Sequence, residues 1–364
     1  MSPSYSNIII RVPNWLGDSF MATPAVSAVR EMFPKAKLTL LAKPAFEAFW
    51  KSYPGVDRVL VLDKKWKHKG LFGFWGLARE LKKQKFDASL VLPLSFSSAF
   101  LFFAAEIPVR IGYGSEGRGL FLTESIPYEK PRQRHLVWEY LRLVQKGFEK
   151  KIGRKKFELT SPTKPGDSEA TAILRKHKII GKNGFIALGP GATYGPAKRW
   201  PLPYWKELIQ KLLKQRSENI LILGGKEEET YLRELADSFK GTKESKRIHL
   251  LAGETSVLGL ASLLSRCKLL VTNDTGPMHV AAAVGTPTVA IFGSTAPLWT
   301  RPFGLGHQVV THHVECSPCF QKTCPIGYIC LNRISTGEVW KAVQKHLSPQ
   351  SFVAAEPVPA GALA

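Results

Sequence analysis

Apolar positions along the chain gather into short β-branched runs, and each run is followed by a longer segment with helical spacing. In the first half this pattern predicts strands at residues 6–12, 38–42, 59–62 and 88–93 and helices at 19–33 and 73–84. In the second half it predicts strands at residues 184–188, 219–223, 248–251, 269–272 and 288–292 and helices at 203–215, 227–239, 257–266 and 277–284. Such alternation is typical of parallel sheets covered by helices on both faces. The sequence therefore predicts an α/β fold with two doubly wound, Rossmann-like domains.

The alternation is interrupted in the middle of the chain, where the residues are rich in Lys, Pro, Ser and Thr. We therefore expect an N-terminal domain over residues 1–160, an inter-domain linker over 161–181 and a C-terminal domain over 182–347. Residues 348–364 are rich in Pro and Ala and are predicted to be a disordered tail. Open α/β sheets bind ligands beyond the carboxyl ends of their strands, so the expected ligand site is a cleft between the domains.

The charge of the chain restricts its partners rather than its fold. It has 51 Lys and Arg against 29 Asp and Glu, a net charge of +22, which favours nucleic acid, a phosphorylated substrate or an anionic membrane. The basic runs at residues 64–69 and 150–156 fit either a solvated face or an anion-binding surface. No stretch has the length and apolarity of a spanning helix, and the N-terminus lacks a signal-peptide pattern, so a cytoplasmic protein is expected.

Cysteines are concentrated near the C-terminus, whereas Cys267 stands apart in an apolar stretch and is expected in the core. The others are Cys316, Cys319, Cys324 and Cys330. Their spacing is compatible with four thiolates around one Zn²⁺, although it is not a standard paired spacing. Reduced structural thiols or a redox pair are the alternatives, and no metal site is assigned.

The turn after the first predicted strand places a carboxylate, Asp18, beside Gly17. A carboxylate at the carboxyl end of a parallel strand can act as a general base on a sugar hydroxyl, or it can cap the following helix. Both interpretations remain open from the spacing alone. The turn lacks the Gly-x-Gly-x-x-Gly pattern, which argues against a dinucleotide site.

Residues 189–201 form a second candidate, a glycine-rich loop between a strand and a helix. Its backbone N–H groups suit a phosphate, and Lys198 adds a positive charge for a diphosphate. The Gly-Lys-Ser/Thr ending of a P-loop is missing, which argues against an ATPase. The alternative is an ordinary glycine-rich loop with a surface lysine.

A third candidate begins at the end of a buried strand, at Asp274, Thr275 and Gly276. The first N–H groups of the next helix point outward there, and Pro277 suits its first turn, so the helix start can bind an anion. His279 lies one turn further and can reach the same anion, although a lone histidine is more often structural. Together, these candidates suggest a nucleotide-diphosphate sugar on the C-terminal domain, and an acceptor with its base on the N-terminal domain.

These segments resemble the heptosyltransferases of lipopolysaccharide inner-core synthesis, glycosyltransferase family 9. The resemblance runs over about residues 7–345 with the motifs in family order, and residues 195–201, Gly-Pro-Ala-Lys-Arg-Trp-Pro, are most similar to type II members. The matching segments are Pro13–Asp18, Leu92–Ser98, Arg110–Tyr113, Gly189–Pro201, Leu251–Thr255 and Thr272–Ala283.

The resemblance implies a GT-B fold and an inverting transfer from ADP-heptose to the first heptose of the Kdo–lipid A inner core. It implies that Asp18 is the general base and that Lys198 stabilises the diphosphate. Tyr194 departs from a second Thr found in some type I members. The implied donor-binding residues are Thr193, Tyr194, Lys198, Asp274, Thr275, Gly276 and His279. The implied acceptor-binding residues are Asn14, Trp15, Ser95 and Arg110.

We expect no cofactor, because Lys198 and the helix start can supply the positive charge that the leaving group needs. We expect the protein to lie on the cytoplasmic face of the inner membrane, with the basic run at residues 64–69 docked on the anionic surface. A second interpretation is a basic nucleic-acid-binding protein, but no recognised nucleic-acid motif is present, so no such partner is expected.

Overall fold

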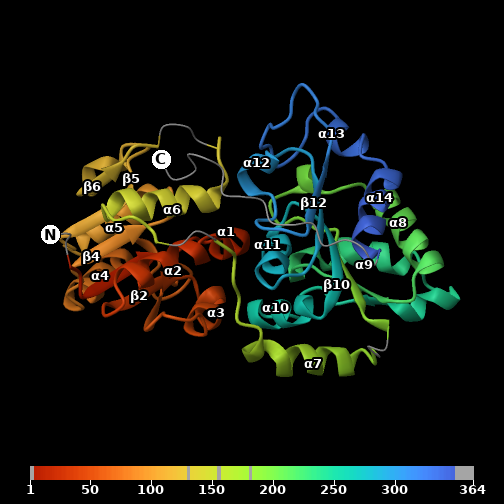
Figure 1. Ribbon diagram of the computed structural model, residues 1–364, viewed down its shortest axis with the longest axis horizontal. Coiled ribbons are helices and arrows are strands. Elements are labelled where there is room, and N and C mark those ends of the chain that lie inside the picture. Colours follow the sequence, from red (N-terminus) through yellow and green to blue (C-terminus); the bar gives the residue numbers. More distant parts are fainter. Residues whose placement is uncertain (1–3, 129–131, 154–156, 180–182, 349–364) are drawn as a thin grey trace. The chain divides into compact units, whose positions relative to one another are not determined.

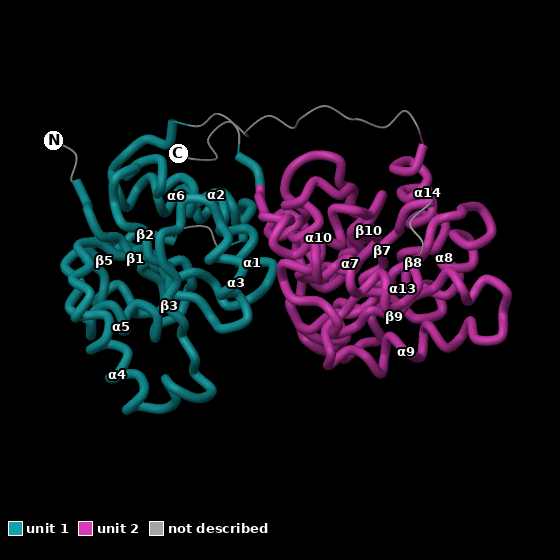
Figure 2. The backbone as a smooth tube through the Cα atoms, turned by 90° about the horizontal axis from the view of Figure 1, so that it is seen from below, with its two compact units in different colours: residues 1–158, 357–364 teal, residues 159–356 magenta. Residues whose placement is uncertain are grey.

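The computed structural model describes residues 4–128, 132–153, 157–179 and 183–348. The chain divides into two compact units; the first ends at Glu158 and the second begins at Leu159 (Figure 2). In both units helices lie around a central sheet (Figure 1). Among the described residues, no helix combines the length and apolarity needed to cross a bilayer.

The first unit contains a parallel sheet with strands β1 (Asn7–Arg11), β2 (Lys37–Ala42), β3 (Arg58–Val61), β4 (Ala88–Val91), β5 (Val109–Tyr113) and β6 (Glu124–Ile126). The order β3-β2-β1-β4-β5-β6 reverses direction between β1 and β4, as in doubly wound folds. Its helices are α1 (Leu16–Met21), α2 (Thr23–Met32), α3 (Glu47–Lys51), α4 (Gly70–Lys83), α5 (Phe96–Ala104) and α6 (Leu136–Gly147), with 3-10 turns η1 (Pro44–Phe46) and η2 (Arg118–Phe121).

The second unit repeats this plan with strands β7 (Phe185–Gly189), β8 (Asn219–Ile222), β9 (Ile248–Leu250), β10 (Cys267–Asn273), β11 (Thr288–Phe292) and β12 (His307–Thr311). All neighbouring strands are parallel, in the order β12-β11-β10-β7-β8-β9. Its helices are α7 (Asp167–Lys176), α8 (Leu202–Gln215), α9 (Glu229–Asp237), α10 (Val257–Ser265), α11 (Gly276–Ala283), α12 (Pro297–Thr300), α13 (Ile329–Asn332) and α14 (Thr336–Leu347), with 3-10 turns η3 (Lys164–Gly166), η5 (Pro196–Lys198), η6 (Lys226–Glu228) and η7 (Lys243–Arg247).

The strands are short β-branched runs because both faces of each sheet are covered. Ile8, Ile9 and Ile10 of β1 are completely buried, and every residue of β11 is buried as well. Continuous apolar burial of this kind distinguishes a covered parallel sheet from an antiparallel sheet with one wet face. The predicted strands correspond to β1–β4 and β7–β11, whereas β5, β6 and β12 were not predicted.

The segment predicted as one helix, residues 19–33, forms two helices, α1 and α2, with Ala22 between them. Pro24 has no N–H to donate and lies in the first turn of α2, where none is needed. The proline therefore starts a new helix instead of continuing the previous one. As a result, α1 is a short helix that directly follows the turn after β1.

The predicted linker, residues 161–181, contains regular structure, since η3 and α7 lie within it and belong to the second unit. Helix α7 packs against α10, where Asp167 accepts hydrogen bonds from Ser262 at 2.5 Å and Arg266 at 3.0 Å. Its acidic first turn and basic last turn also suit the helix dipole. The expected linker boundary is therefore corrected: the described residues 161–179 are part of the second unit. The predicted tail lies, apart from Ser348, outside the described residues.

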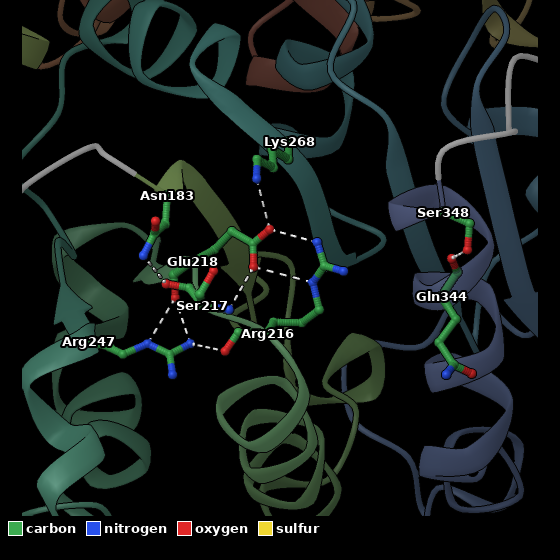
Figure 3. Close-up of polar contacts among 8 residues, drawn as sticks. All are labelled: Asn183, Arg216, Ser217, Glu218, Arg247, Lys268, Gln344 and Ser348. Atoms are coloured by element: carbon green, nitrogen blue, oxygen red, sulfur yellow. Dashed lines mark hydrogen bonds and ion pairs between the residues drawn. The ribbon is translucent and has the colours of Figure 1, made fainter.

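An ion cluster stabilises the amino-terminal edge of the second sheet, opposite the edge where the strands end (Figure 3). Glu218 precedes β8 and is 2% exposed; its carboxylate contacts Arg216 at 2.8 Å and Lys268 at 2.9 Å. Arg247 donates to the carbonyl of Glu218 at 2.9 Å. Burial alone would raise the pKa of Glu218, but the hydrogen bonds from Arg216 and Lys268 lower it to about 2.

Replacing Glu218 by Gln is expected to destabilise the protein by about 1–3 kcal/mol at pH 7, because charged hydrogen bonds are lost at a buried position. The folded pKa lies below the ordinary value of 4.5, so this stabilisation is present above pH 4.5 and is lost as the pH falls toward 2. Urea unfolding at pH 7 and at a pH between 2 and 4.5 measures the difference in the free energy of unfolding between variant and wild type. Glu207→Gln, an exposed position, is the control. An equal difference at both pH values would contradict the ion-pair origin.

Candidate functional site

The loop after β7 is fixed to the end of β10 by Asn273. Its amide donates to the carbonyls of Pro190 at 2.6 Å and Gly191 at 3.2 Å, and its side-chain oxygen accepts from the backbone N–H of Trp200 at 3.1 Å. Asn273 is completely buried, so these bonds replace bonds to water. The glycine-rich loop is therefore held at both ends against the carboxyl edge of the sheet.

Lys198 and Asp274, predicted from separate motifs, meet at this edge. The Nζ of Lys198 lies 2.5 Å from Oδ2 of Asp274, and the same oxygen accepts from the hydroxyl of Thr295 at 2.6 Å. The side chains of Lys198 and Asp274 are 15% and 5% exposed. The pair is thus largely shielded from water, where its attraction is stronger than on the surface. Thr295 is a site residue that the sequence analysis missed.

Helix α11 begins directly beside this pair. Thr275 is its N-cap residue and makes no side-chain cap hydrogen bond, so the first N–H groups are not covered by its hydroxyl. Gly276 and Pro277 form the first turn, and His279 is buried one turn further. The arrangement presents the positive end of the helix dipole together with a lysine, which suits a phosphate group.

Thr193 and Tyr194 lie in the same loop as Lys198, with Thr193 exposed and Tyr194 partly buried. The Nζ of Lys198 lies 5.0 Å from the centre of the Tyr194 ring, within cation–π range. The Tyr194 hydroxyl donates to the carbonyl of Phe320 at 2.6 Å. Tyr194 therefore fixes the loop through its hydroxyl and contacts Lys198 through its ring. All the predicted donor-binding residues belong to the second unit, on the segments after β7 and β10.

In the first unit, Asp18 lies in the first turn of α1, but the N-cap position is occupied by Trp15. The interpretation of Asp18 as the N-cap residue is therefore not supported. Tyr140 of α6 is buried nearby: its burial, and then the negative charge of Asp18, raise the pKa of Tyr140 well above its ordinary value. The Asp18 carboxylate is partly exposed, as a general base acting on a bound hydroxyl must be.

Arg11 supports this turn and was not predicted as a site residue. It is 1% exposed, and its guanidinium donates to the carbonyls of Val12 at 2.5 Å and Leu41 at 2.9 Å and to the side-chain oxygen of Asn14. Burial lowers the pKa of Arg11 to about 10. Asn14 is therefore held by a buried cation, whereas Trp15 is 59% exposed.

The other two predicted acceptor residues come from the segment after β4 and from within β5. Ser95 precedes α5, and its hydroxyl lies 2.7 Å from that of Ser98. Arg110 is in the amino-terminal half of β5, and its guanidinium donates to the carbonyls of Phe121 at 2.7 Å and Ile107 at 2.5 Å. The register pairs Arg110 with Ser89, so it is not at the carboxyl end of its strand. The structure thus does not bring Arg110 to the edge that carries Asp18.

A different arginine lies at that edge. Arg118 donates to the carbonyl of Tyr113, the last residue of β5, at 2.5 Å. It also donates to the carbonyl of Pro93, which follows β4, at 3.2 Å. Its burial lowers its pKa. The glycine-rich sequence around it, Gly114–Gly119, was the only signal for a special turn after β5.

The clustered cysteines are free, and Cys330 is buried. Burial raises the pKa of Cys330, as does the proximity of Cys316, Cys319 and Cys324. Among the described residues, no three His, Cys, Asp or Glu side chains are arranged to hold a metal ion. Cys267 is buried in the core, as expected.

Comparison with known proteins connects this chain to one family. The model of glycosyltransferase family 9 (heptosyltransferase) matches residues 74–329. The lipooligosaccharide heptosyltransferase 2 of Campylobacter jejuni is 30% identical over 88% of this chain and 92% of its own length. The structure of the E. coli ADP-heptose LPS heptosyltransferase II is 25% identical, with a TM-score of 0.78 over 94% of this chain and 98% of that one. A family 9 glycosyltransferase from Veillonella parvula, 22% identical with a TM-score of 0.82 over 95% and 98%, shares the fold. The predicted GT-B, α/β fold is confirmed.

Proposed function

The chain belongs to glycosyltransferase family 9, the heptosyltransferases, and we propose that it transfers heptose from ADP-heptose, with inversion, to the first heptose of the Kdo–lipid A inner core. Relatives that match 83–88% of the chain include heptosyltransferases 2 of lipooligosaccharide or lipopolysaccharide. The observation that carries the donor class is the meeting of Lys198 and Asp274 at the start of α11. A lysine beside the N-terminus of a helix matches a diphosphate better than an uncharged ligand.

In the proposed reaction, Asp18 accepts the proton of the acceptor hydroxyl while that oxygen attacks the anomeric carbon of the donor. The bond from the anomeric carbon to the diphosphate oxygen breaks on the opposite face, which inverts the configuration. ADP leaves with the bonding electrons. Lys198 and the N–H groups at the start of α11 stabilise the charge that develops on the diphosphate.

The direct test is ADP release from ADP-heptose in the presence of heptosyl-Kdo2–lipid A. We expect acceptor-dependent release, and little release with ADP-glucose as the donor. Kdo2–lipid A, which lacks the first heptose, is the control acceptor. Release with Kdo2–lipid A alone would contradict the proposed acceptor. If the protein binds ADP but releases none with any of these donors and acceptors, the proposed sugar transfer is contradicted, and only the proposed ADP part of the donor still stands.

The acceptor is an anionic lipid, and we propose that the first unit docks on the anionic inner face of the inner membrane. Exposed apolar side chains lie on α4, α5 and η2; we call this set, Phe72, Trp75, Phe96, Phe103 and Leu120, the aromatic face. Phe72 and Leu120 are 94% and 86% exposed. The rings of Phe74, Trp75, Phe96, Phe100, Phe103 and Phe121 contact one another in a continuous network. Exposed aromatic side chains suit the interface of a bilayer.

The basic run before α4 adds charge beside this face. Lys67 is paired with Glu80 at 2.9 Å, whereas Lys64, Lys65 and Lys69 form no ion pair in the described part of the chain. Unpaired lysines near an anionic leaflet each contribute about 1 kcal/mol of attraction. The aromatic face and the basic run therefore favour an anionic over a neutral bilayer.

Phe72→Ser with Trp75→Ser is expected to reduce binding to phosphatidylglycerol-containing vesicles about tenfold or more, because exposed apolar area is lost from the interface. Vesicle co-sedimentation measures the loss, with Leu298→Ser, an exposed position in the second unit, as the matched control. Lys64→Glu with Lys65→Glu is expected to remove the salt-sensitive part of binding. Unchanged binding of both double variants would contradict docking through this face.

A further inference from the structure

The cysteine-rich loop, residues 314–328, is attached to the donor site by hydrogen bonds. The carbonyl of Lys322 accepts from the backbone N–H of Ala197 at 3.0 Å, and the carbonyl of Phe320 accepts from Tyr194 at 2.6 Å. On the other side, the N–H of Phe320 donates to the carbonyl of Ser294 at 2.8 Å. The loop thus bridges the glycine-rich loop after β7 and the segment after β11.

Gly195 shows how close this contact is. A Cβ at position 195 would lie 2.4 Å from the carbonyl oxygen of Lys322, closer than real Cβ atoms come to a backbone oxygen. Glycine at this position therefore allows the cysteine-rich loop to approach the glycine-rich loop. The approach has a specific result, because it brings the side chain of Lys322 to Tyr194.

Tyr194 has an ammonium group of each loop near its ring. The Nζ of Lys322 lies 6.0 Å from the ring centre, and the Nζ of Lys198 lies 5.0 Å from it. Both ammonium groups therefore lie near the Tyr194 ring. An anion that contacts both lysines would be attracted by both charges.

The two lysines differ in their partners. Lys198 is paired with Asp274, so this pair carries no net charge. Lys322 is exposed and forms no ion pair within the described residues, and its charge is not offset. A diphosphate bound at the start of α11 would meet one compensated lysine and one uncompensated lysine. The uncompensated charge is the one that adds most to the attraction of an anion.

We propose that Lys322 is a second cation for the diphosphate of the donor and that the cysteine-rich loop holds it in the site. The inference rests on the proposed function for the donor class, a nucleoside-diphosphate sugar. The proposed role of Lys322 is to bind the diphosphate and stabilise its charge, and this role is separate from proton transfer by Asp18. Nothing in the sequence pattern pointed to Lys322, because it lies outside the three motifs.

The test compares ADP with adenosine by calorimetric titration. Lys322→Met is expected to weaken ADP binding about tenfold, a typical loss for one charged contact, and to leave adenosine binding unchanged. Lys322→Arg is expected to retain most of the affinity for ADP. Lys206→Met, an exposed lysine of α8, is the control and should bind ADP as the wild type does.

The outcomes separate this inference from the proposed function. Wild-type binding of ADP with no change in Lys322→Met overturns the role of Lys322 and leaves the proposed function standing. An equal loss of adenosine and ADP binding in Lys322→Met also overturns it, because a general loop defect would then explain the effect. No ADP binding by the folded wild-type protein overturns the proposed donor itself.

Gly195→Ala supplies an independent test of the loop's placement. The added Cβ is expected to displace the loop and to weaken ADP binding in the wild-type background. In the Lys322→Met background the same change is expected to have little further effect, because the displaced cation is already absent. Equal losses in both backgrounds would contradict an effect that acts through Lys322.

Discussion

Replacing Asp18 by Asn is expected to slow acceptor-dependent ADP release by about 10²- to 10⁴-fold, the usual contribution of a general base. Asparagine keeps the shape of the side chain but cannot take up the proton of the acceptor hydroxyl. The proposed donor-binding residues belong to the second unit, so ADP binding is expected to be unchanged. Steady-state rates with ADP-heptose and heptosyl-Kdo2–lipid A, together with calorimetric ADP binding, measure both effects.

The control for this variant is Glu47→Gln, which removes a carboxylate from α3 in the same unit, where it is paired only with the exposed Lys51. It should transfer heptose at the wild-type rate. Thermal unfolding of both variants excludes a folding defect at α1. A rate for Asp18→Asn within about threefold of wild type would be too small a loss for a general base and would reject that role.

Replacing Lys198 by Ala is expected to lower kcat/KM by about 10²- to 10³-fold, as the loss of one group that stabilises transition-state charge commonly does. It removes the positive charge that we propose for the diphosphate, and it leaves the largely buried carboxylate of Asp274 without its cation. The unpaired carboxylate repels the donor, so ADP affinity should fall as well. Transfer kinetics and ADP titration measure the two losses separately.

A second substitution separates these contributions. In Lys198→Ala with Asp274→Asn, the repulsion is removed but the cation is still absent, so we expect ADP affinity to recover in part and kcat to remain low. Recovery of both would show that Lys198 serves only to neutralise Asp274. Lys198→Ala with wild-type kcat/KM would contradict its role in the reaction.

Most of the two sheets could be predicted because their central strands are buried on both faces. Residues 288–292 were predicted as a strand with the bounds that β11 has, and their burial is complete. Periodicity fails where an element is uniformly apolar or too short. Helix α5, almost wholly apolar, was missed because it has no polar face to give a helical period.

Helix α7 was missed for the opposite reason. Only Ala170, Ile173 and Leu174 are buried on it, and the composition around it is that of a linker. Its stability comes from α10, through contacts that no local pattern contains, such as the hydrogen bonds from Ser262 and Arg266 to Asp167. Packing against α10, and not a local sequence pattern, therefore stabilises this segment as a helix.

Some residues of the candidate site could be predicted from the sequence, and others could not. The sequence placed Lys198 and Asp274 in separate motifs after two strands, and parallel neighbours β7 and β10 bring them together. Arg110 was expected to contact the acceptor. The strand register shows that it lies within β5 and not at the carboxyl end, and the sequence alone does not give this register. Thr295 and Lys322 come from segments after β11 and β12, and their approach to the site depends on the order of strands in the sheet.

The contact between Lys198 and Asp274 would also make the proposed donor site selective among anions. Any ligand that recruits Lys198 must offset the loss of a 2.5 Å ion pair that is largely shielded from water. A single inorganic phosphate has few groups with which to do so, whereas a nucleotide sugar adds contacts from its base, ribose and second phosphate. In the proposed site, the Asp274 carboxylate would therefore compete with small anions for Lys198 and favour the larger donor.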